Sequence, residues 1–276
     1  MTAVRRPSLA LVVTHFGPVP LWLPAFLLSC RHNPDVRWMI YTDMDAPSSV
    51  PANVVLRPLQ LHEFNRRASE VLRTTIDVRP SYLRKLGDLK PTYGLVFEED
   101  LRPFDFWAYS ELDIVWGDIR QFLTDDLLWA HDVVSARHYK LCGHCTVFRN
   151  DARINRTFEI VPDAVRSMAD PGYLRLDESQ FTSELRGRME QTPRPWLPRV
   201  HWERELTMSA KYQTALGDDD ADRLWWKNGK TFLADGKELM YLHFHRLKTF
   251  MSTIDFGYED TPSAFSVSRR GVLARG

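Results

Sequence analysis

The sequence has no excess charge of either sign, few cysteines and no long uninterrupted apolar run. Its 276 residues include 36 Lys and Arg against 36 Asp and Glu. That balance argues against a protein that binds nucleic acid through bulk positive charge, and against one that charge holds on a membrane. Hydrophobic residues make up 44% and charged residues 26%, which excludes a disordered chain. We therefore expect a globular protein with no nucleic-acid partner.

The cysteines and the apolar start of the chain bear on its compartment. Three cysteines, an odd number, provide no disulfide framework and agree with a reducing environment. Residues 8–30 follow two arginines and are apolar enough to suggest a signal peptide. Three prolines interrupt this stretch, so a strand, a loop and a helix fit it better. We expect a cytoplasmic protein without an integral membrane segment.

Short apolar runs alternate with segments of helical length along the first half of the chain. The runs predict strands at 9–13, 37–42, 104–109, 131–136 and 145–149, and helices at 19–30, 59–73 and 81–89. Continuously apolar strands separated by helices indicate a parallel sheet that is covered on both faces. Residues 186–222 are rich in Pro, Arg and Asp, and we interpret them as an irregular excursion within one domain. The predicted fold class is α/β with a mostly parallel central sheet.

Two carboxylates directly follow the third predicted strand. Glu111 and Asp113, at positions i and i+2, point to the same side of an extended chain. In an open α/β sheet, ligands bind at the carboxyl ends of the strands. Carboxylates suit Mg²⁺ or Mn²⁺, which take diphosphate oxygens as further ligands. A pair at this spacing is more often a solvated strand end, but the apolar residues on both sides favour a buried site that needs these acids.

The sequence YLHFH near the C-terminus contains two histidines in alternation. In a strand, His243 and His245 lie on one face, as a metal-binding pair or as one ligand beside a phosphate contact. The alternative is a partly buried strand whose histidines are hydrogen-bonded within the protein. Lys248 downstream is a further candidate for a phosphate contact.

The sequence Cys142-Gly143-His144-Cys145 matches the redox motif of protein disulfide isomerases letter for letter. That chemistry needs the first cysteine at a helix N-terminus, which lowers the pKa of its thiol. The residues that follow are β-branched and aromatic, so the motif enters a strand, which disfavours both a redox function and half of a zinc site. We interpret Gly143 and His144 instead as a loop of close approach at the lip of a cleft.

Two further charged segments each leave two interpretations open. Lys85 and Lys90 flank Asp88, either at an ordinary helix end or in a diphosphate clamp where Asp88 orients a lysine or contacts a ribose. Asp177 and Glu178 open a short helix, either as a simple N-cap or as carboxylates near the reacting carbon.

The order of these motifs resembles a known family. Along the chain stand THFG, YTD, KLGDLKPTYG, FDFWAYSELDIVWGDIR, GHCTVFRN, LDES and YLHFHRLK. This order resembles GT-A glycosyltransferases, specifically bacterial polysaccharide-type proteins with KLCDFKPAYG, YxDLDxxxGD, GHxTLYRN, an acidic pair and LHFHxxK. The resemblance covers roughly residues 8–250, with 186–222 unmatched. It implies a single GT-A (Rossmann-like) domain over 1–276, with a nucleotide-binding half (1–113), an acceptor-binding half (114–250) and a C-terminal tail (251–276).

The resemblance also implies roles for matched positions. Asp113 matches the metal-binding last Asp of DxD, and Glu111 stands where the first Asp is usual, so a ribose or water contact is expected of it beside metal ligation. His243 or His245 matches the late histidine that completes the metal coordination. The other implied contacts are Thr14, His15 and Asp43 with the base and ribose, Lys85, Asp88 and Lys90 with the donor, Gly143 and His144 with the acceptor, and Asp177 and Glu178 with the acceptor or the reacting sugar.

The expected activity is metal-dependent transfer of a sugar from a UDP-sugar or other NDP-sugar to a hydroxyl of a small-molecule or glycan acceptor. Mn²⁺ or Mg²⁺ would neutralise the leaving diphosphate, with Lys85 or Lys90 assisting. If the enzyme inverts, Asp177 or Glu178 is the general base, and if it retains, the pair stabilises the oxocarbenium-like state.

Two alternatives to this activity remain at the level of sequence. The first is a GT-A-like domain that binds a nucleotide or glycan without turnover, which Glu111 in place of Asp favours. The second is a metal hydrolase built on Glu111, Asp113 and the two histidines, which the lack of a further close acid and histidine cluster disfavours. The oligomeric state has no signal in the sequence.

Overall fold

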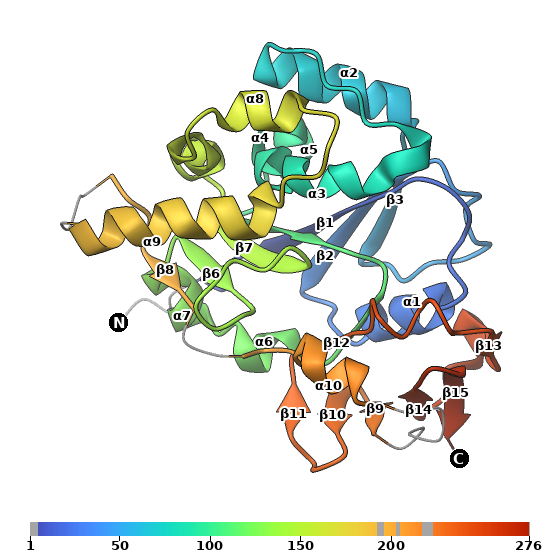
Figure 1. Cartoon of the computed structure of the whole chain (residues 1–276). Helices are drawn as coiled ribbons and strands as arrows, with labels where there is room; N and C mark the ends of the chain where they lie inside the picture. The colour runs from blue at the N-terminus through green and yellow to red at the C-terminus, as the bar shows by residue number, and fades with distance from the viewer. Residues whose placement is uncertain (1–4, 192–195, 203–204, 217–222, 276) are drawn as a thin grey trace.

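A seven-stranded sheet forms the centre of the computed structural model, which describes residues 5–191, 196–202, 205–216 and 223–275 (Figure 1). In spatial order its strands are β3 (Val54–Pro58), β2 (Val36–Thr42), β1 (Leu9–His15), β4 (Phe106–Ser110), β7 (Cys145–Arg149), β6 (Val133–Ser135) and β8 (Val200–His201). β7 is antiparallel to both of its neighbours, and the other pairs are parallel. The predicted α/β class with a mostly parallel central sheet is confirmed.

Helices cover both faces of this sheet, and the side chains of β1 show how. Ala10 and Val12 pack with Phe64 in one core cluster, whereas Leu11 packs with Phe26 in a second cluster on the opposite face. Because successive strand residues point to opposite faces, an uninterrupted apolar run supplies both cores.

The helices fall on two sides of the sheet in Figure 1, with α2, α3, α4, α5 and α8 on one side and α1 and α6 on the other. The α-helices are α1 (Leu23–Arg31), α2 (Leu61–Leu72), α3 (Leu86–Leu89), α4 (Tyr93–Val96), α5 (Glu98–Leu101), α6 (Ile119–Phe122), α7 (Asp125–Ala130), α8 (Ala164–Ala169), α9 (Phe181–Gln191) and α10 (Ala210–Thr214). The 3₁₀ and π turns are η1 (Pro80–Lys85), η2 (Lys90–Thr92), η3 (Ile154–Ile160), the π-helical η4 (Leu176–Gln180) and η5 (Tyr258–Asp260). No helix in these described segments is both long and apolar enough to cross a membrane.

Two predicted helices differ from the observed ones. The helix predicted at 19–30 begins only at Leu23, with Pro24 in its first turn, because the prolines before it favour an extended loop. The segment predicted as one helix at 81–89 consists of the 3₁₀ turn η1 and the short helix α3, and η1 is interrupted at Tyr82, which has non-helical backbone angles (φ −144°, ψ 54°).

A second, six-stranded sheet lies beside α1. Its strands in order are β11 (Glu238–Leu239), β10 (Lys230–Leu233), β9 (Leu224–Lys227), β14 (Ala264–Val267), β15 (Gly271–Arg275) and β13 (Thr253–Ile254). Ala25 and Leu28 of α1 belong to the same apolar cluster as this sheet, which ties it to the main body. The segment 251–276, predicted to be a tail, therefore contributes three strands and corrects that interpretation.

The predicted irregular excursion at 186–222 is also corrected where it is described. It contains the end of α9, strand β8 at the edge of the main sheet, and α10. Residues 192–195, 203–204 and 217–222 of that prediction lie outside the described residues. The Pro and Arg content hid these short elements, of which β8 is a strand only through its pairing with β6.

Two strand pairings set the position of the site. Ser110, the last residue of β4, is paired with Cys145 at the start of the antiparallel β7, so the loop before β7 lies beside the residues after β4. Strand β12 (Tyr241–His243) pairs with β5 (Ile114–Trp116), and His243 is opposite Ile114. Three segments that are distant in sequence thus meet at one edge of the sheet.

Candidate active site

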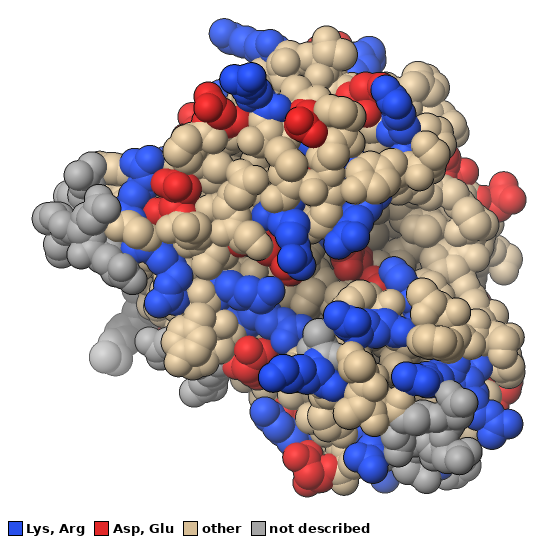
Figure 2. Space-filling view, viewed as in Figure 1, with Lys and Arg blue, Asp and Glu red and all other residues tan. Residues whose placement is uncertain are grey.

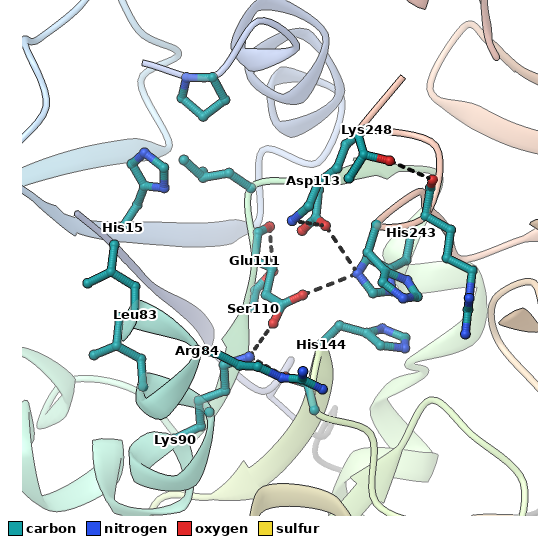
Figure 3. Close-up of a pocket in the computed structure, with 18 of the residues that line it drawn as sticks. His15, Leu83, Arg84, Lys90, Ser110, Glu111, Asp113, His144, His243 and Lys248 are labelled. Atoms are coloured by element: carbon teal, nitrogen blue, oxygen red, sulfur yellow. Dashed lines mark hydrogen bonds and ion pairs between the residues drawn. The ribbon is translucent and has the colours of Figure 1, made fainter. Parts of the chain in front are cut away.

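Three side chains with metal-ligating atoms meet at this edge. Glu111 and Asp113 follow β4, and His243 ends β12. One ligand atom from each of the three lies within 4.8 Å of the others. His243 Nε2 is 3.1 Å from Glu111 Oε2 and 3.5 Å from Asp113 Oδ2. Dashed lines in Figure 3 mark both contacts. The structure thus brings the two carboxylates and one of the two candidate histidines to a single point.

The chemistry of this cluster fits a divalent cation. His243 Nδ1 is buried without a hydrogen bond, and the buried atoms His243 Nε2 and Asp113 Oδ2 have only ion-pair contacts. Buried polar atoms are costly to leave in that state, so their convergence favours a ligand that binds all of them. Carboxylate oxygens with an imidazole nitrogen suit Mn²⁺, and the carboxylates also suit Mg²⁺.

The electrostatics of the cluster keep its carboxylates charged. Burial opposes ionisation of Glu111, but Lys90 and His243 together outweigh it and hold the pKa of Glu111 below its ordinary value. Burial likewise opposes ionisation of Asp113, and His243 and Lys248 lower its pKa. The two carboxylates in turn raise the pKa of His243 against the effect of burial. A cation would replace the proton of His243 on binding.

The cluster forms the floor of a pocket of about 1240 Å³. Lys90 Nζ donates to Glu111 and, at 2.6 Å, to the carbonyl oxygen of Gly143, whose N–H donates to Glu178 Oε1 at 3.1 Å. Charged contacts therefore continue across the floor, in the order Lys248, Asp113, His243, Glu111, Lys90, Gly143, Glu178 and Lys140. The carboxylate cluster lies toward one end of this series, and the Asp177–Glu178 segment lies at the other.

Asp177 lines the pocket in a different environment. Its side chain is only 2% exposed, and Tyr173 donates its hydroxyl hydrogen to Oδ1 at 3.1 Å. A Cβ at position 143 would overlap Asp177 Oδ2, so Gly143 is the residue that lets this carboxylate approach. Burial, with Glu178 nearby, raises the pKa of Asp177 to about 6 although Lys90 opposes the shift. A carboxylate with this pKa can accept a proton near neutral pH.

His144 packs against the cluster rather than offering it a ligand atom. Its Nε2 is 2.9 Å from Cys142 Sγ and its Nδ1 is 2.8 Å from the hydroxyl of Tyr241, so both ring nitrogens are engaged. Its ring lies on that of His243, with the centroids 3.9 Å apart. The acceptor contact predicted for His144 would therefore involve only its ring edge, and the ring holds His243 in place.

The cysteines of this loop have the environment of packing residues. Cys142 and Cys145 are buried and free, and the motif enters strand β7 rather than a helix. Burial raises the pKa of the Cys142 thiol to about 11, which is the opposite of what a redox nucleophile needs.

Lys85 and Asp88 do not line the pocket, whereas Lys90, which the sequence places in the same possible diphosphate clamp, does. Asp88 is fully buried and accepts Lys85 Nζ at 2.9 Å together with the N–H groups of Leu174 and Leu176 at 2.8 Å. Lys85 Nζ also donates to two backbone carbonyls in the segment 167–172. The Lys85–Asp88 ion pair therefore fixes the conformation of the segment before Asp177, although neither side chain lines the pocket.

The residues predicted to bind the base and ribose are divided. Thr14 and His15 line the pocket at the end of β1, and the hydroxyl groups of Thr14 and Tyr93 are 2.6 Å apart. Asp43 lies outside the pocket lining and accepts the N–H of Gly17 at 2.7 Å. Because Gly17 has a φ of +114°, this contact holds a loop conformation that favours glycine.

His245 lines the pocket but is not part of the three-residue cluster. Strand β12 ends at His243, yet the two rings still stack at 5.0 Å between centroids. Burial and the neighbouring His243 lower the pKa of His245 to about 4, so it is neutral at pH 7. Of the two histidines that the sequence leaves equivalent, His243 is the one that faces the carboxylates.

Among the other lining residues, Tyr173 and Arg175 have no prediction of their own in the sequence, whereas Arg84 belongs to the basic segment that also contains Lys85 and Lys90. Tyr173 hydrogen-bonds Asp177, the guanidinium of Arg84 lies 4.8 Å from the Tyr173 ring centroid, and Arg175 directly precedes η4. Arg84 stands in a visibly basic segment, but no pattern in the sequence distinguishes Tyr173 or Arg175 from ordinary surface residues.

Comparison with known proteins places the chain in a family. A sequence model with the description "Family of unknown function (DUF6625)" matches residues 11–272. The chain belongs to this family. No curated protein matches it in sequence.

Solved glycosyltransferase structures are similar to the chain over most of its length. Mouse xyloside xylosyltransferase 1 in its apo form has a TM-score of 0.46 at 8% identity, over 84% of this chain and 96% of that one. The galactosyltransferase LgtC with donor and acceptor sugar analogues has a TM-score of 0.43 at 10% identity, over 91% and 93%. The bifunctional glycosyltransferase WbbM has a TM-score of 0.44 at 11% identity, over 89% and 47%. Similarity at this level carries no activity across, so a function must come from the site itself.

Proposed function

We propose that this protein is a metal-dependent glycosyltransferase that moves a sugar from a UDP-sugar, or another nucleoside-diphosphate sugar, to a hydroxyl of a small-molecule or glycan acceptor. The observation that carries the proposal is the convergence of Glu111, Asp113 and His243 on the floor of a large pocket. Ligands of α/β sheets bind at this edge, and the order of sequence motifs, which resembles that of GT-A enzymes, supports the same conclusion.

Each end of the pocket has a distinct part in this function. Asp113, Glu111 and His243 would hold Mn²⁺ or Mg²⁺. When bound, such an ion supplies positive charge against the leaving diphosphate. Lys90 and Lys248, which already pair with the carboxylates, add positive charge on either side of that point. At about 1240 Å³ the pocket exceeds the roughly 300–1,000 Å³ of a typical small-ligand site and has room for donor and acceptor together.

Asp177 is the general base of this proposal. Its raised pKa suits a group that takes a proton from an acceptor hydroxyl, whereas a carboxylate that stabilises positive charge needs a low pKa. We therefore favour an inverting reaction over a retaining one. The hydrogen bond from Tyr173 orients Asp177, and the missing side chain of Gly143 leaves room for it. The negative charge of Glu178 makes the ionised form of Asp177 less favourable.

The test is incubation of the full chain with UDP- and GDP-sugars, with Mn²⁺ or with EDTA, together with calorimetry of UDP and GDP binding. We expect Mn²⁺-dependent nucleotide binding and slow release of nucleotide from at least one donor. If no nucleotide binds and no donor is hydrolysed, the proposal is wrong. Nucleotide binding that EDTA does not change, without product from any donor, would instead support a binding protein that lacks turnover.

A further inference from the structure

The pocket is much more basic than the protein as a whole. Eight Lys and Arg side chains line it against four carboxylates, although the chain contains 36 of each class. Figure 2 shows Lys and Arg gathered around the central hollow of this face. Positive charge concentrated at a cleft raises the local concentration of anions and steers them into it.

Two of these cations lie beside the cluster of Glu111, Asp113 and His243. Lys248 Nζ is 2.8 Å from Asp113 Oδ2, and Lys90 pairs with Glu111. A donor diphosphate at the carboxylate cluster would have these two lysines as neighbours. They do not explain the positive charge at the opposite end.

Three cations that line the pocket are connected to Asp177 and Glu178 by contact or by position in the chain. Arg84, from η1, lies over the ring of Tyr173, whose hydroxyl donates to Asp177. Arg175 directly precedes η4, and Lys140 Nζ is 3.4 Å from Glu178 Oε2. In Figure 3 the side chain of Arg84 extends from its helix into the pocket.

The charges at this end do not balance. The negative charge of Glu178 offsets the positive charge of Lys140, and Asp177 is buried and accepts the hydroxyl hydrogen of Tyr173. Within the described part of the chain, neither Arg84 nor Arg175 forms an ion pair with a carboxylate, and both are exposed. Two positive charges among the residues that line the pocket are therefore not offset by a carboxylate.

We propose that the acceptor carries a phosphate group, which Arg84 and Arg175 bind beside Asp177. The inference rests on the proposed function, because it takes this end of the pocket as the acceptor side. A phosphomonoester has close to two negative charges, which matches the two unpaired guanidinium groups, and guanidinium binds phosphate oxygens through paired N–H donors.

The phosphate could belong to a free sugar phosphate or to a lipid. Tyr82, Leu174 and Tyr139 are 42%, 38% and 61% exposed, and they stand within two residues of Arg84, Arg175 and Lys140 respectively. Exposed apolar side chains beside cations suit a lipid phosphate as well as a soluble one, so the experiment includes both.

The experiment measures binding by calorimetry, with and without UDP and Mn²⁺. The soluble probes are glucose 6-phosphate, glucose and glucuronate, and the lipid probe is dodecyl phosphate in neutral detergent micelles, with the empty micelles as control. We expect glucose 6-phosphate to bind at least tenfold more tightly than glucose and than glucuronate, and to bind together with UDP. Tighter binding of the micellar phosphate would assign the group to a lipid, and weaker binding would assign it to a soluble acceptor.

The matched variants are Arg84→Gln with Arg175→Gln, and Arg66→Gln with Arg156→Gln, which removes two exposed arginines outside the pocket. The Arg84→Gln, Arg175→Gln variant should bind glucose 6-phosphate at least tenfold more weakly and keep Mn²⁺-dependent UDP affinity within twofold of the wild type. The Arg66→Gln, Arg156→Gln variant should change neither affinity. The inference is overturned if glucuronate binds equally well, if the first pair has no effect, or if UDP displaces glucose 6-phosphate. Failure of UDP to bind contradicts the proposed function alone, because the titration without nucleotide still reports on the phosphate site.

Discussion

The pocket contains carboxylates at both ends, of which Asp113 and Asp177 are 3% and 2% exposed and yet differ in their electrostatics. At one end the pKa values of Glu111 and Asp113 are lowered, because Lys90, Lys248 and His243 outweigh the effect of burial. At the other end the pKa of Asp177 is raised to about 6, because burial and neighbouring carboxylates outweigh Lys90. Burial alone therefore does not decide whether a carboxylate is a cation ligand or a base. The neighbouring charges decide it.

Substitution of the cation-binding end should have the largest effect. Asp113→Asn keeps the shape of the side chain and removes its negative charge. We therefore expect Mn²⁺-dependent turnover to fall about a hundredfold or more. Circular dichroism should show an unchanged fold, and Mn²⁺ binding should weaken in parallel. Asp126→Asn, at an exposed position on α7, is the control. Unchanged turnover in Asp113→Asn would contradict the metal site.

Substitution of the base should lower turnover and raise stability. The pKa of Asp177 is about 6 in the folded protein and about 4 when unfolded. The folded state therefore favours the protonated form. The resulting stabilisation is complete below pH 4 and is lost as the pH rises through 6. We expect Asp177→Asn, which cannot ionise, to exceed the wild type in unfolding free energy at pH 8 by up to about 3 kcal/mol, and to lose that advantage near pH 4.

The pH dependence of turnover gives an independent check on Asp177. Because a base must be ionised, the wild-type rate should fall about tenfold per pH unit below pH 6. A rate that stays level between pH 6 and pH 5, or an Asp177→Asn variant with normal turnover, would remove Asp177 from the mechanism.

The two histidines should separate by their response to added metal. His243→Ala should weaken Mn²⁺-dependent UDP binding about tenfold to a hundredfold, and excess Mn²⁺ should partly restore it, since His243 faces both carboxylates. His245→Ala should lower turnover without such rescue. His62→Ala, at an exposed position on α2, is the control. If neither pocket variant alters metal dependence, His243 is a packing residue.

The smallest effect is expected at the cysteines. In Cys142→Ser with Cys145→Ser, the hydroxyl that replaces the Cys142 thiol can still hydrogen-bond His144, so turnover should stay within about threefold of the wild type. Oxidants and reductants should change neither protein. Activity that appears only after oxidation or reduction would restore the redox interpretation of this loop.

Local sequence patterns predicted the long strands of the central sheet well. The apolar runs of β1, β2 and β7 are continuous because helices cover both faces, and this makes them visible without a structure. The helix predicted at 81–89 is a 3₁₀ turn followed by a short α-helix, and no local signal marks Tyr82, where the 3₁₀ turn leaves the helical region. The short strands β8 and β13 have two residues each and are strands only through their partners.

The same distinction applies to the charged residues of the site. Lys85 and Asp88 look in sequence like a phosphate clamp, whereas contacts with the segment 167–176 bury both of them. Lys90, five residues after Lys85, reaches the pocket instead. Spacing along the chain identified the right segment, but which of its charges faces a ligand depends on what packs behind it.

The sequence by itself determined the apolar strands, the position of Glu111 and Asp113 at the end of one of them, and the strand that follows Cys142-Gly143-His144-Cys145. Each of these features depends only on the backbone geometry of a few consecutive residues, and the residue types and their spacing are enough to predict it. Only the tertiary structure decided that His243 joins the carboxylates, since this depends on β12 pairing with β5 across more than a hundred residues. It also decided that Asp177 has a raised pKa, because the free energy of ionising a side chain depends on the groups that the fold brings around it.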